Sequence, residues 1–304
     1  MKLKIIKIKN NNLGIAGNII CALEILNYRK KNELIYFDFK NVLYSNKINT
    51  WDKFCYQPFY EFNDLIQKKI KQKNYEIEHY KNNNFFKFNY FYNDDKIFYN
   101  TKVVEPLRKK LKKYIRFKNN IISKYKTFKN QNLAQNTLSI HLRGGDRFQV
   151  RPWNKIRLVH NKNIKTEPYK KYNILFNFSK YEEYIKKIFN TKNCNKIFLA
   201  TDDKYYLMNM KKKFNTSMLP SYSKLINKYK IDTFNDNQDL GAHQLNVYED
   251  EETKTRLGEE AIIDSIIMSK CKYSLLSKSN VSLLSILLRD NYNFSFLDGH
   301  IKYI

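Results

Sequence analysis

The sequence is poor in glycine, proline and acidic residues. Among 304 residues there are 7 Gly and 5 Pro, and the 56 Lys and Arg outnumber the 29 Asp and Glu, which gives a formal net charge of +27. The chain contains neither a G-x-G-x-x-G run nor a P-loop lysine, so both common glycine-rich nucleotide fingerprints are excluded. The cysteines are scattered without a C-x-x-C pair: Cys21, Cys55, Cys194 and Cys271. We therefore expect no zinc site, no disulfide framework and reduced thiols.

Long apolar runs are also missing. No stretch approaches the length of a membrane span. The first residues, MKLKIIKIKNNN, alternate lysine with apolar residues as a first β-strand does, and they lack the apolar core of a signal peptide. We expect a cytoplasmic protein that is soluble or at most peripheral to a membrane.

The basic excess admits three partners, namely nucleic acid, an anionic membrane surface and a phosphate-bearing substrate. A coding bias competes with all three, because the lysines come with abundant Asn, Ile, Tyr and Phe. No zinc-ligand spacing, arginine-rich arm or aromatic RNA-binding signature supports a nucleic-acid partner, so we predict none. Peripheral contact with an anionic membrane stays open.

Hydrophobic residues make up 42% of the chain, which suffices for a globular core. Alternating strand and helix patterns predict an α/β fold with parallel sheets. We expect strands at 3–8, 33–39, 137–141, 196–200 and 272–276, and helices at 19–31, 103–129, 179–190, 258–271 and 281–290. In the helix at 258–271 we expect the acids to lie in the first turn. A domain boundary is predicted near residue 130.

Three of these strands end in polar turns, at 141–146 (HLRGGD), 201–203 (TDD) and 277–280 (SKSN). In an open parallel sheet, ligands bind beyond the carboxyl ends of the strands. We therefore expect the three turns to converge on one cleft.

Each turn suits part of a sugar nucleotide. The guanidinium of Arg143 can bind two phosphate oxygens at once, and the two glycines after it allow close backbone approach. Ser277, Ser279 and Asn280 lie at a helix start, where N–H groups and hydroxyls bind anions. The carboxylate of Asp202 can accept two hydrogen bonds from the N–H groups of guanine, which adenine and uracil cannot donate as a pair.

Structural alternatives exist for each group. Arg143 and Asp146 can pair with each other and brace their loop, and Asp203 is placed to cap a helix. The serines can be ordinary caps, and His141 can be a structural histidine. A small-residue loop at Gly14, Ala16, Gly17 and Asn18 can direct N–H groups at phosphate or serve only as a tight turn.

These motifs resemble those of a known family. IHLRGGD resembles the H-x-R-x-G/T-D motif of the α1,2-, α1,6- and protein O-fucosyltransferases. IFLATDD resembles their second motif, and EEAIIDSIIMSKCKYSLLSKSNVSLLSILL their third. GIAGN is a looser match to their glycine-rich donor loop. The resemblance covers roughly residues 131–290, and the first 130 only in outline.

The resemblance implies a GT-B architecture, with two Rossmann-like domains facing across a cleft. The domain at 1–130 would lie on the acceptor side and the domain at 131–304 would bind the donor. It implies inverting, metal-independent transfer of a sugar, with fucose expected, from a GDP-sugar to a glycan, a lipid-linked saccharide or another hydroxyl acceptor, and no cofactor. Arg143 would neutralise the β-phosphate, His141 and Asp202 would contact the nucleoside, and residues 277–280 would hold the pyrophosphate.

Together these interpretations define the predicted site. The catalytic candidates are Arg143 and Asp146. The predicted nucleotide-sugar ligands are Gly14, Gly17, Asn18, His141, Arg143, Asp202, Asp203, Ser277, Ser279 and Asn280. Asp38, Glu61 and Asp146 all remain candidates for the base that activates the acceptor hydroxyl. Two other functions stay open, a transferase of the same fold that uses GDP-heptose or GDP-mannose, and a non-catalytic basic module that binds polyanions.

Overall fold

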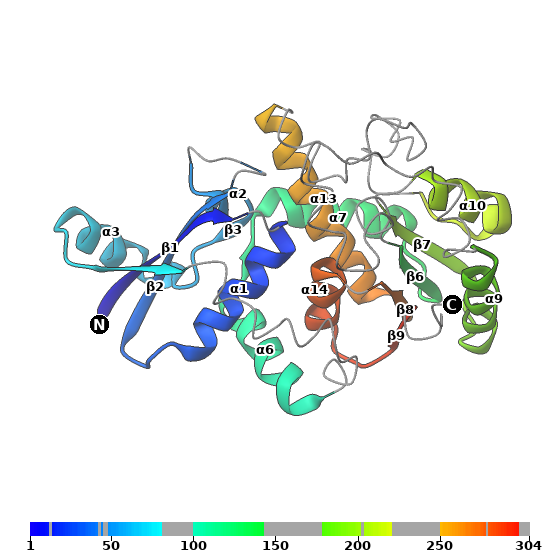
Figure 1. The fold of residues 1–304 in the computed structure, drawn as a ribbon, viewed down its shortest axis with the longest axis horizontal. Coiled ribbons are helices and arrows are strands. Elements are labelled where there is room, and N and C mark those ends of the chain that lie inside the picture. The colour runs from blue at the N-terminus through cyan, green and yellow to red at the C-terminus, as the bar shows by residue number, and fades with distance from the viewer. Residues whose placement is uncertain are drawn as a thin grey trace, which may run out of the picture. The chain divides into compact units, whose positions relative to one another are not determined.

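The computed structural model describes residues 1–11, 14–41, 44, 48–80, 100–142, 178–201, 204–220, 250–277 and 279–297 (Figure 1). Its contacts divide the chain into two compact units. The first comprises Met1–Thr127, Asn246–Ser269 and Ser279–Tyr292, and the second comprises Phe128–Leu245, Lys270–Lys278 and Asn293–Ile304. No helix in the described ranges combines the length and the apolarity needed to cross a membrane.

The first unit contains a parallel sheet with the strand order β2-β1-β4. Strands β1 (Lys2–Asn11) and β2 (Glu33–Asn41) lie where the sequence predicted them. Strand β4 (Glu76–Tyr80) was not predicted, because its acids disguise the strand pattern. Those acids pair with lysines of β1, Glu78 with Lys4 at 3.4 Å and Glu76 with Lys2, so ion pairs reinforce this edge of the sheet.

Helices α1 (Ile15–Tyr28), α6 (Thr101–Tyr114) and α14 (Asn280–Leu288) pack against one another in the first unit. Buried Arg108 of α6 donates to the carbonyl oxygens of Ile286, at 3.0 Å, and Asn291, at 2.8 Å. The last carbonyls of a helix lack intrahelical partners, so Arg108 satisfies the carboxyl end of α14. Helix α14, which comes late in the sequence, thereby completes the packing of the first unit.

Helix α13 (Glu251–Lys270) is longer than predicted. Its first-turn acids are Glu251 and Glu252, so the prediction that placed Glu259 and Glu260 there was wrong. Glu259 lies in the middle of the helix and is buried, where it accepts hydrogen bonds from Asn120 and Lys124. Asn120 and Lys124, which are distant in sequence, thus stabilise the carboxylate of Glu259, which the sequence pattern had placed at the start of a helix.

The predicted helix over 103–129 is interrupted. After α6 the chain extends into β5 (Arg116–Phe117), which pairs antiparallel with β3 (Cys55–Tyr56), and then forms α7 (Asn119–Asn132). The pairing with β3 explains the break, because β3 provides hydrogen-bond partners for the backbone N–H and C=O groups of the extended segment. The remaining short elements of this region are α2 (Thr50–Phe54), η1 (Tyr60–Phe62) and α3 (Asn63–Lys71).

The second unit contains a four-stranded parallel sheet with the order β7-β6-β8-β9. Its strands are β6 (Thr137–Leu142), β7 (Lys196–Thr201), β8 (Tyr273–Leu276) and β9 (Phe294–Phe296). Every residue of β6 is buried, as expected for a central strand of a parallel sheet. The remaining elements are α9 (Phe178–Thr191), α10 (Lys204–Phe214) and η7 (Asn215–Ser217). The predicted α/β class with parallel sheets is confirmed.

The predicted boundary near residue 130 falls close to the first division between the units, after Thr127. The segments Asn246–Ser269 and Ser279–Tyr292 nevertheless belong to the first unit, although the predicted domain 131–304 contained them. Compact packing does not by itself show which segments fold independently, so the two domains at 1–130 and 131–304 stay a prediction.

Candidate functional site

The three strands that carry the motifs are neighbours. β6 lies between β7 and β8 and runs parallel to both, and His141 is in register with Ala200 of β7 and with Leu276 of β8. Parallel strands in this register bring their carboxyl ends to one edge of the sheet. The chain therefore leaves the three strands at adjacent positions on that edge.

The charged members of the predicted site lie outside the described residues. These are Arg143, Asp146, Asp202 and Asp203. Their roles stay predictions, and the described geometry bears on them only through the strand ends from which their loops begin.

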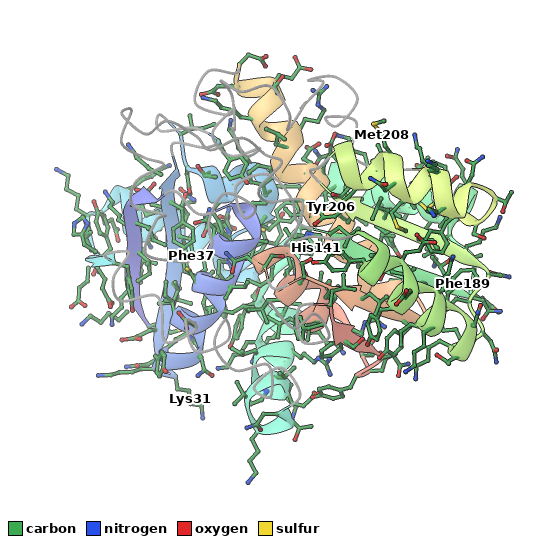
Figure 2. The ribbon with its side chains drawn as sticks, turned by 45° about the vertical axis from the view of Figure 1, so that its right-hand side comes forward. Lys31, Phe37, His141, Phe189, Tyr206 and Met208 are labelled. Carbon is green, nitrogen blue, oxygen red and sulfur yellow. The ribbon has the colours of Figure 1, made fainter. Side chains whose placement is uncertain are left out.

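His141 lies at the end of β6 and is buried (Figure 2). Its carbonyl oxygen accepts two hydrogen bonds from Ser277, one from the backbone N–H at 3.0 Å and one from the hydroxyl at 2.9 Å. These bonds continue the pairing of β6 and β8 past the last ladder position. Because the Ser277 hydroxyl donates its single proton to His141, it can only accept a hydrogen bond from a ligand in this arrangement.

Ser279 forms the N-cap of α14. Its hydroxyl accepts a hydrogen bond from the backbone N–H of Ser282 at 3.1 Å, and Asn280 is the first residue of the helix. A capping serine is a sufficient structural reason for its presence. The phosphate-binding role predicted for residues 277–280 therefore rests on the N–H groups of the first helical turn more than on the two serine hydroxyls.

The predicted loop over Gly14, Gly17 and Asn18 is wrong in its boundary. Helix α1 begins at Ile15, so Gly17 and Asn18 lie buried in its first turn, and Gly14 is the N-cap. The hydroxyl of Tyr44 accepts a hydrogen bond from the Ile15 N–H at 2.8 Å. Burial raises the pKa of Tyr44 to about 12, although this hydrogen bond lowers it in part. The neutral phenol of Tyr44 is thus already bonded to one of the backbone N–H groups that were predicted to bind phosphate.

Two of the three candidate bases are described. Asp38 of β2 forms an ion pair with Lys7 of β1 at 3.6 Å. Glu61 lies in η1 and is exposed to solvent. The third candidate, Asp146, lies outside the described residues, so the geometry does not choose among them.

Sequence analysis missed a buried acid on α13. Asp264 is 8% exposed, and its Oδ1 atom has no hydrogen-bond partner among the described residues. Burial raises the pKa of Asp264 well above its ordinary value, and the negative charge of Glu260 adds to the rise. The available signal was an acid within the otherwise apolar run AIIDSIIMS. Unsatisfied buried polar atoms are rare in native proteins, so each one needs an explanation, such as strain, a catalytic role, or a bound water or ion.

Arg256 carries a second unsatisfied group on the same helix. Its Nε and one terminal nitrogen are buried and have no hydrogen-bond partner in the part of the chain that the structure describes, and Nε lies 3.9 Å from Oε1 of Glu260. Residues four apart share one side of a helix, so Arg256, Glu260 and Asp264 form a charged row along α13. Within the described ranges, no three His, Cys, Asp or Glu side chains are placed to hold a metal ion.

No protein-family model matches the sequence, and no curated protein matches it. Solved structures do resemble the fold. A crystal structure of fucosyltransferase NodZ from Bradyrhizobium matches with a TM-score of 0.51 and 11% identity over 99% of this chain and 98% of that chain. A selenomethionine form of the same enzyme gives a TM-score of 0.53 and 11% identity, over 95% of this chain and 93% of that chain.

A crystal of NodZ α1,6-fucosyltransferase soaked with GDP-fucose matches with a TM-score of 0.51 and 11% identity, again over 95% of this chain and 93% of that chain. At this identity the likeness concerns the fold alone. The chain has the parallel α/β fold of these fucosyltransferase structures.

Proposed function

We propose that the protein is a glycosyltransferase that takes its sugar from a GDP-sugar, with fucose as the expected sugar. The observation that carries the proposal is the adjacency of β6, β7 and β8, whose carboxyl ends lead into the three motif-bearing turns. The likeness to fucosyltransferase structures over nearly the whole of both chains supports it.

The proposed chemistry centres on the loop after β6. As the bond between sugar and phosphate breaks, negative charge builds on the departing GDP. The Arg143 guanidinium would stabilise that charge more in the transition state than in the ground state, which lowers the barrier. The proposed reaction is inverting, needs no metal and uses a glycan or another hydroxyl compound as the acceptor.

Selectivity for guanine would come from a carboxylate. Asp202, which follows the last residue of β7 in the sequence, is the proposed acceptor of the N1–H and N2–H groups of the base. Inosine diphosphate lacks the N2 amino group, so it offers one donor in place of two. A matched pair of titrations with GDP and IDP therefore measures this contact, and Asp202→Asn should reduce the preference for GDP.

Thermal unfolding with added nucleotides tests the donor class. At a concentration a hundred times its Kd, a nucleotide that binds the folded chain stabilises it by about 2.7 kcal/mol, which raises Tm by about 4 °C. We expect GDP to produce this shift and UDP, ADP and CDP to produce little. Equal shifts with all four nucleotides, or none with GDP, would contradict the proposal.

The net charge of +27 supports a different candidate, a non-catalytic module that binds polyanions. This module would bind heparin with a steep salt dependence and would release no GDP from any GDP-sugar. Measuring GDP release from GDP-fucose, GDP-mannose and GDP-heptose separates it from the enzyme, and the same assay identifies the sugar.

A further inference from the structure

The outer strand of the first sheet has a sequence that favours pairing with other strands. Within the described residues β2 pairs with β1 alone, so its other side is an edge of the sheet. Residues 34–39 read LIYFDF, an apolar and aromatic run with no proline, no glycine and one acid. A segment of this composition pairs readily with another chain when its edge is open.

The side-chain amide of Gln57 bonds to this edge as a strand residue would. Its Oε1 accepts a hydrogen bond from the Phe37 N–H at 2.9 Å, and its Nε2 donates to the Phe37 carbonyl oxygen at 3.0 Å. Opposite residues of an antiparallel pair exchange the same two bonds. Phe37, which Figure 2 labels, is thus paired on its outer side by one side chain in place of a strand.

Asn49 bonds to the next position of the edge. Its Oδ1 accepts a hydrogen bond from the Phe39 N–H at 2.9 Å, and its Nδ2 donates to the Phe37 carbonyl oxygen at 2.6 Å. Its amide therefore reaches two alternate residues of β2, as one residue of a parallel strand does. Together the amides of Asn49 and Gln57 bond the N–H groups of Phe37 and Phe39 and the Phe37 carbonyl.

Asp52 orients both amides. Its Oδ1 accepts a hydrogen bond from Nε2 of Gln57 at 2.7 Å, and its Oδ2 accepts one from Nδ2 of Asn49 at 2.8 Å. The Tyr36 hydroxyl also donates to Oδ2, at 3.3 Å. A carboxylate can only accept, so it fixes which end of each amide carries the N–H groups. We call Asn49, Asp52 and Gln57 the β2 edge clamp.

The clamp is anchored in the core through α2. Trp51 of this helix is fully buried against Phe37 and Phe39, with ring centroids 4.7 Å and 5.5 Å away. Asp52 is the next residue of α2, and Asn49 caps the helix by accepting a hydrogen bond from the Trp51 N–H at 3.2 Å. The packing of one aromatic cluster thus holds the clamp against the strand that it covers.

We infer that the β2 edge clamp protects the first sheet against strand addition, and that two copies of the chain pair through β2 when the clamp is removed. The inference goes beyond the proposed transfer reaction and does not depend on it. Each copy would offer the same N–H and carbonyl groups of Phe37 and Phe39 to the other. Contact between identical patches gives a closed, symmetric dimer.

Two variants that differ only at position 57 test the inference. Asn49→Ser with Gln57→Ala removes both amides but keeps a residue that can cap α2. Asn49→Ser with Gln57→Lys loses the same bonds and places a charge at the edge, which opposes strand pairing. The lysine adds one charge to a chain of net charge +27, so a difference between the variants reports the edge and not the total charge.

Sedimentation velocity at several protein concentrations measures the association. We expect the lysine variant to sediment like the unaltered chain. The alanine variant should add a species of twice that mass, in a fraction that rises with concentration. If circular dichroism shows that the double variants are unfolded, Gln57→Ala and Gln57→Lys alone, which keep Asn49, provide the same comparison.

Amide hydrogen exchange at Phe37 and Phe39 identifies the surface that pairs. Exchange should be roughly tenfold faster in the lysine variant than in the unaltered chain, because each N–H loses its partner. In the alanine variant it should slow again as the dimer forms. The same association state in both variants, or a dimer in which these two amides still exchange fast, would overturn the inference.

Discussion

The carboxyl ends of the two sheets differ in how their polar groups are satisfied. In the first unit, Lys7 pairs with Asp38 shortly before β1 and β2 end, and the Ile15 N–H of the following helix is bonded to Tyr44. In the second unit, the residues of β6, β7 and β8 include no carboxylate, and the bond past the strand ends joins the neutral groups of Ser277 and His141. An anion that binds near the carboxyl ends of the first sheet would compete with the carboxylate of Asp38 for Lys7. The strands of the second sheet contribute no such carboxylate.

The largest expected effect tests this contrast directly. Arg143→Ala should lower kcat by about 10²–10³-fold, by analogy with the loss of one oxyanion donor. Lys7→Ala, which removes a cation from the central strand of the first sheet, should change kcat by less than about threefold, because only a partly exposed ion pair is lost. Steady-state GDP release measures both variants.

Arg143→Lys sharpens the same measurement. Lysine keeps the charge but cannot bind two phosphate oxygens in a fork, so activity should fall between those of the unaltered enzyme and Arg143→Ala. If Arg143→Ala stays within tenfold of the unaltered enzyme, the role assigned to this residue is wrong.

The second expected effect concerns the unsatisfied acid of the first unit. A carboxyl whose pKa is raised by folding contributes stability fully below the ordinary value of 3.8, and this contribution is lost as the pH rises through the elevated folded pKa. At neutral pH, Asp264→Asn should therefore stabilise the nucleotide-free chain by roughly 1–3 kcal/mol. Chemical denaturation at several pH values should show a gain that grows with pH.

The response to GDP separates two roles for Asp264. If the carboxyl binds a ligand, Asp264→Asn should raise Tm without nucleotide and reduce the shift caused by GDP. A raised Tm with an unchanged GDP shift would leave Asp264 as a destabilising group with no part in donor binding. A lower Tm at neutral pH would contradict the explanation from burial.

The smallest expected effects compare two hydroxyls. Tyr44→Phe removes the bond to the Ile15 N–H, and Ser277→Ala removes one of two bonds to the His141 carbonyl. Each should cost about 0.5–1.5 kcal/mol of stability. Only Ser277→Ala should also reduce the thermal shift caused by GDP, and an equal reduction in Tyr44→Phe would erase the distinction between the two edges.

The strands of the second sheet were predictable because each is a short apolar run that ends in polar residues. β6, β7 and β8 lie within one residue of the predicted bounds, and the Ser279 cap of α14 follows from a local preference. These features depend on residues near one another in sequence. For the same reason, the shared edge of the three strands could be anticipated before any coordinates existed.

The errors all depend on partners distant in sequence. The start of α1 was misplaced because the hydroxyl that bonds the N–H of its first residue, Ile15, belongs to Tyr44, 29 positions away. The helical spacing continues through Ile115, so only the pairing of β5 with β3 reveals the break. Asp264 drew no notice because a carboxyl without a partner can be recognised only once its surroundings are known.

The interleaving of the two units has a consequence for how the protein is made. The first unit is finished only by the segments Asn246–Ser269 and Ser279–Tyr292, which supply most of α13 and all of α14. A nascent chain must therefore extend past α14 before the apolar sides of α1 and α6 that face this helix can be covered. Until then these helices expose apolar side chains, so we expect a chain truncated before residue 280 to be prone to aggregation even with its first 130 residues intact.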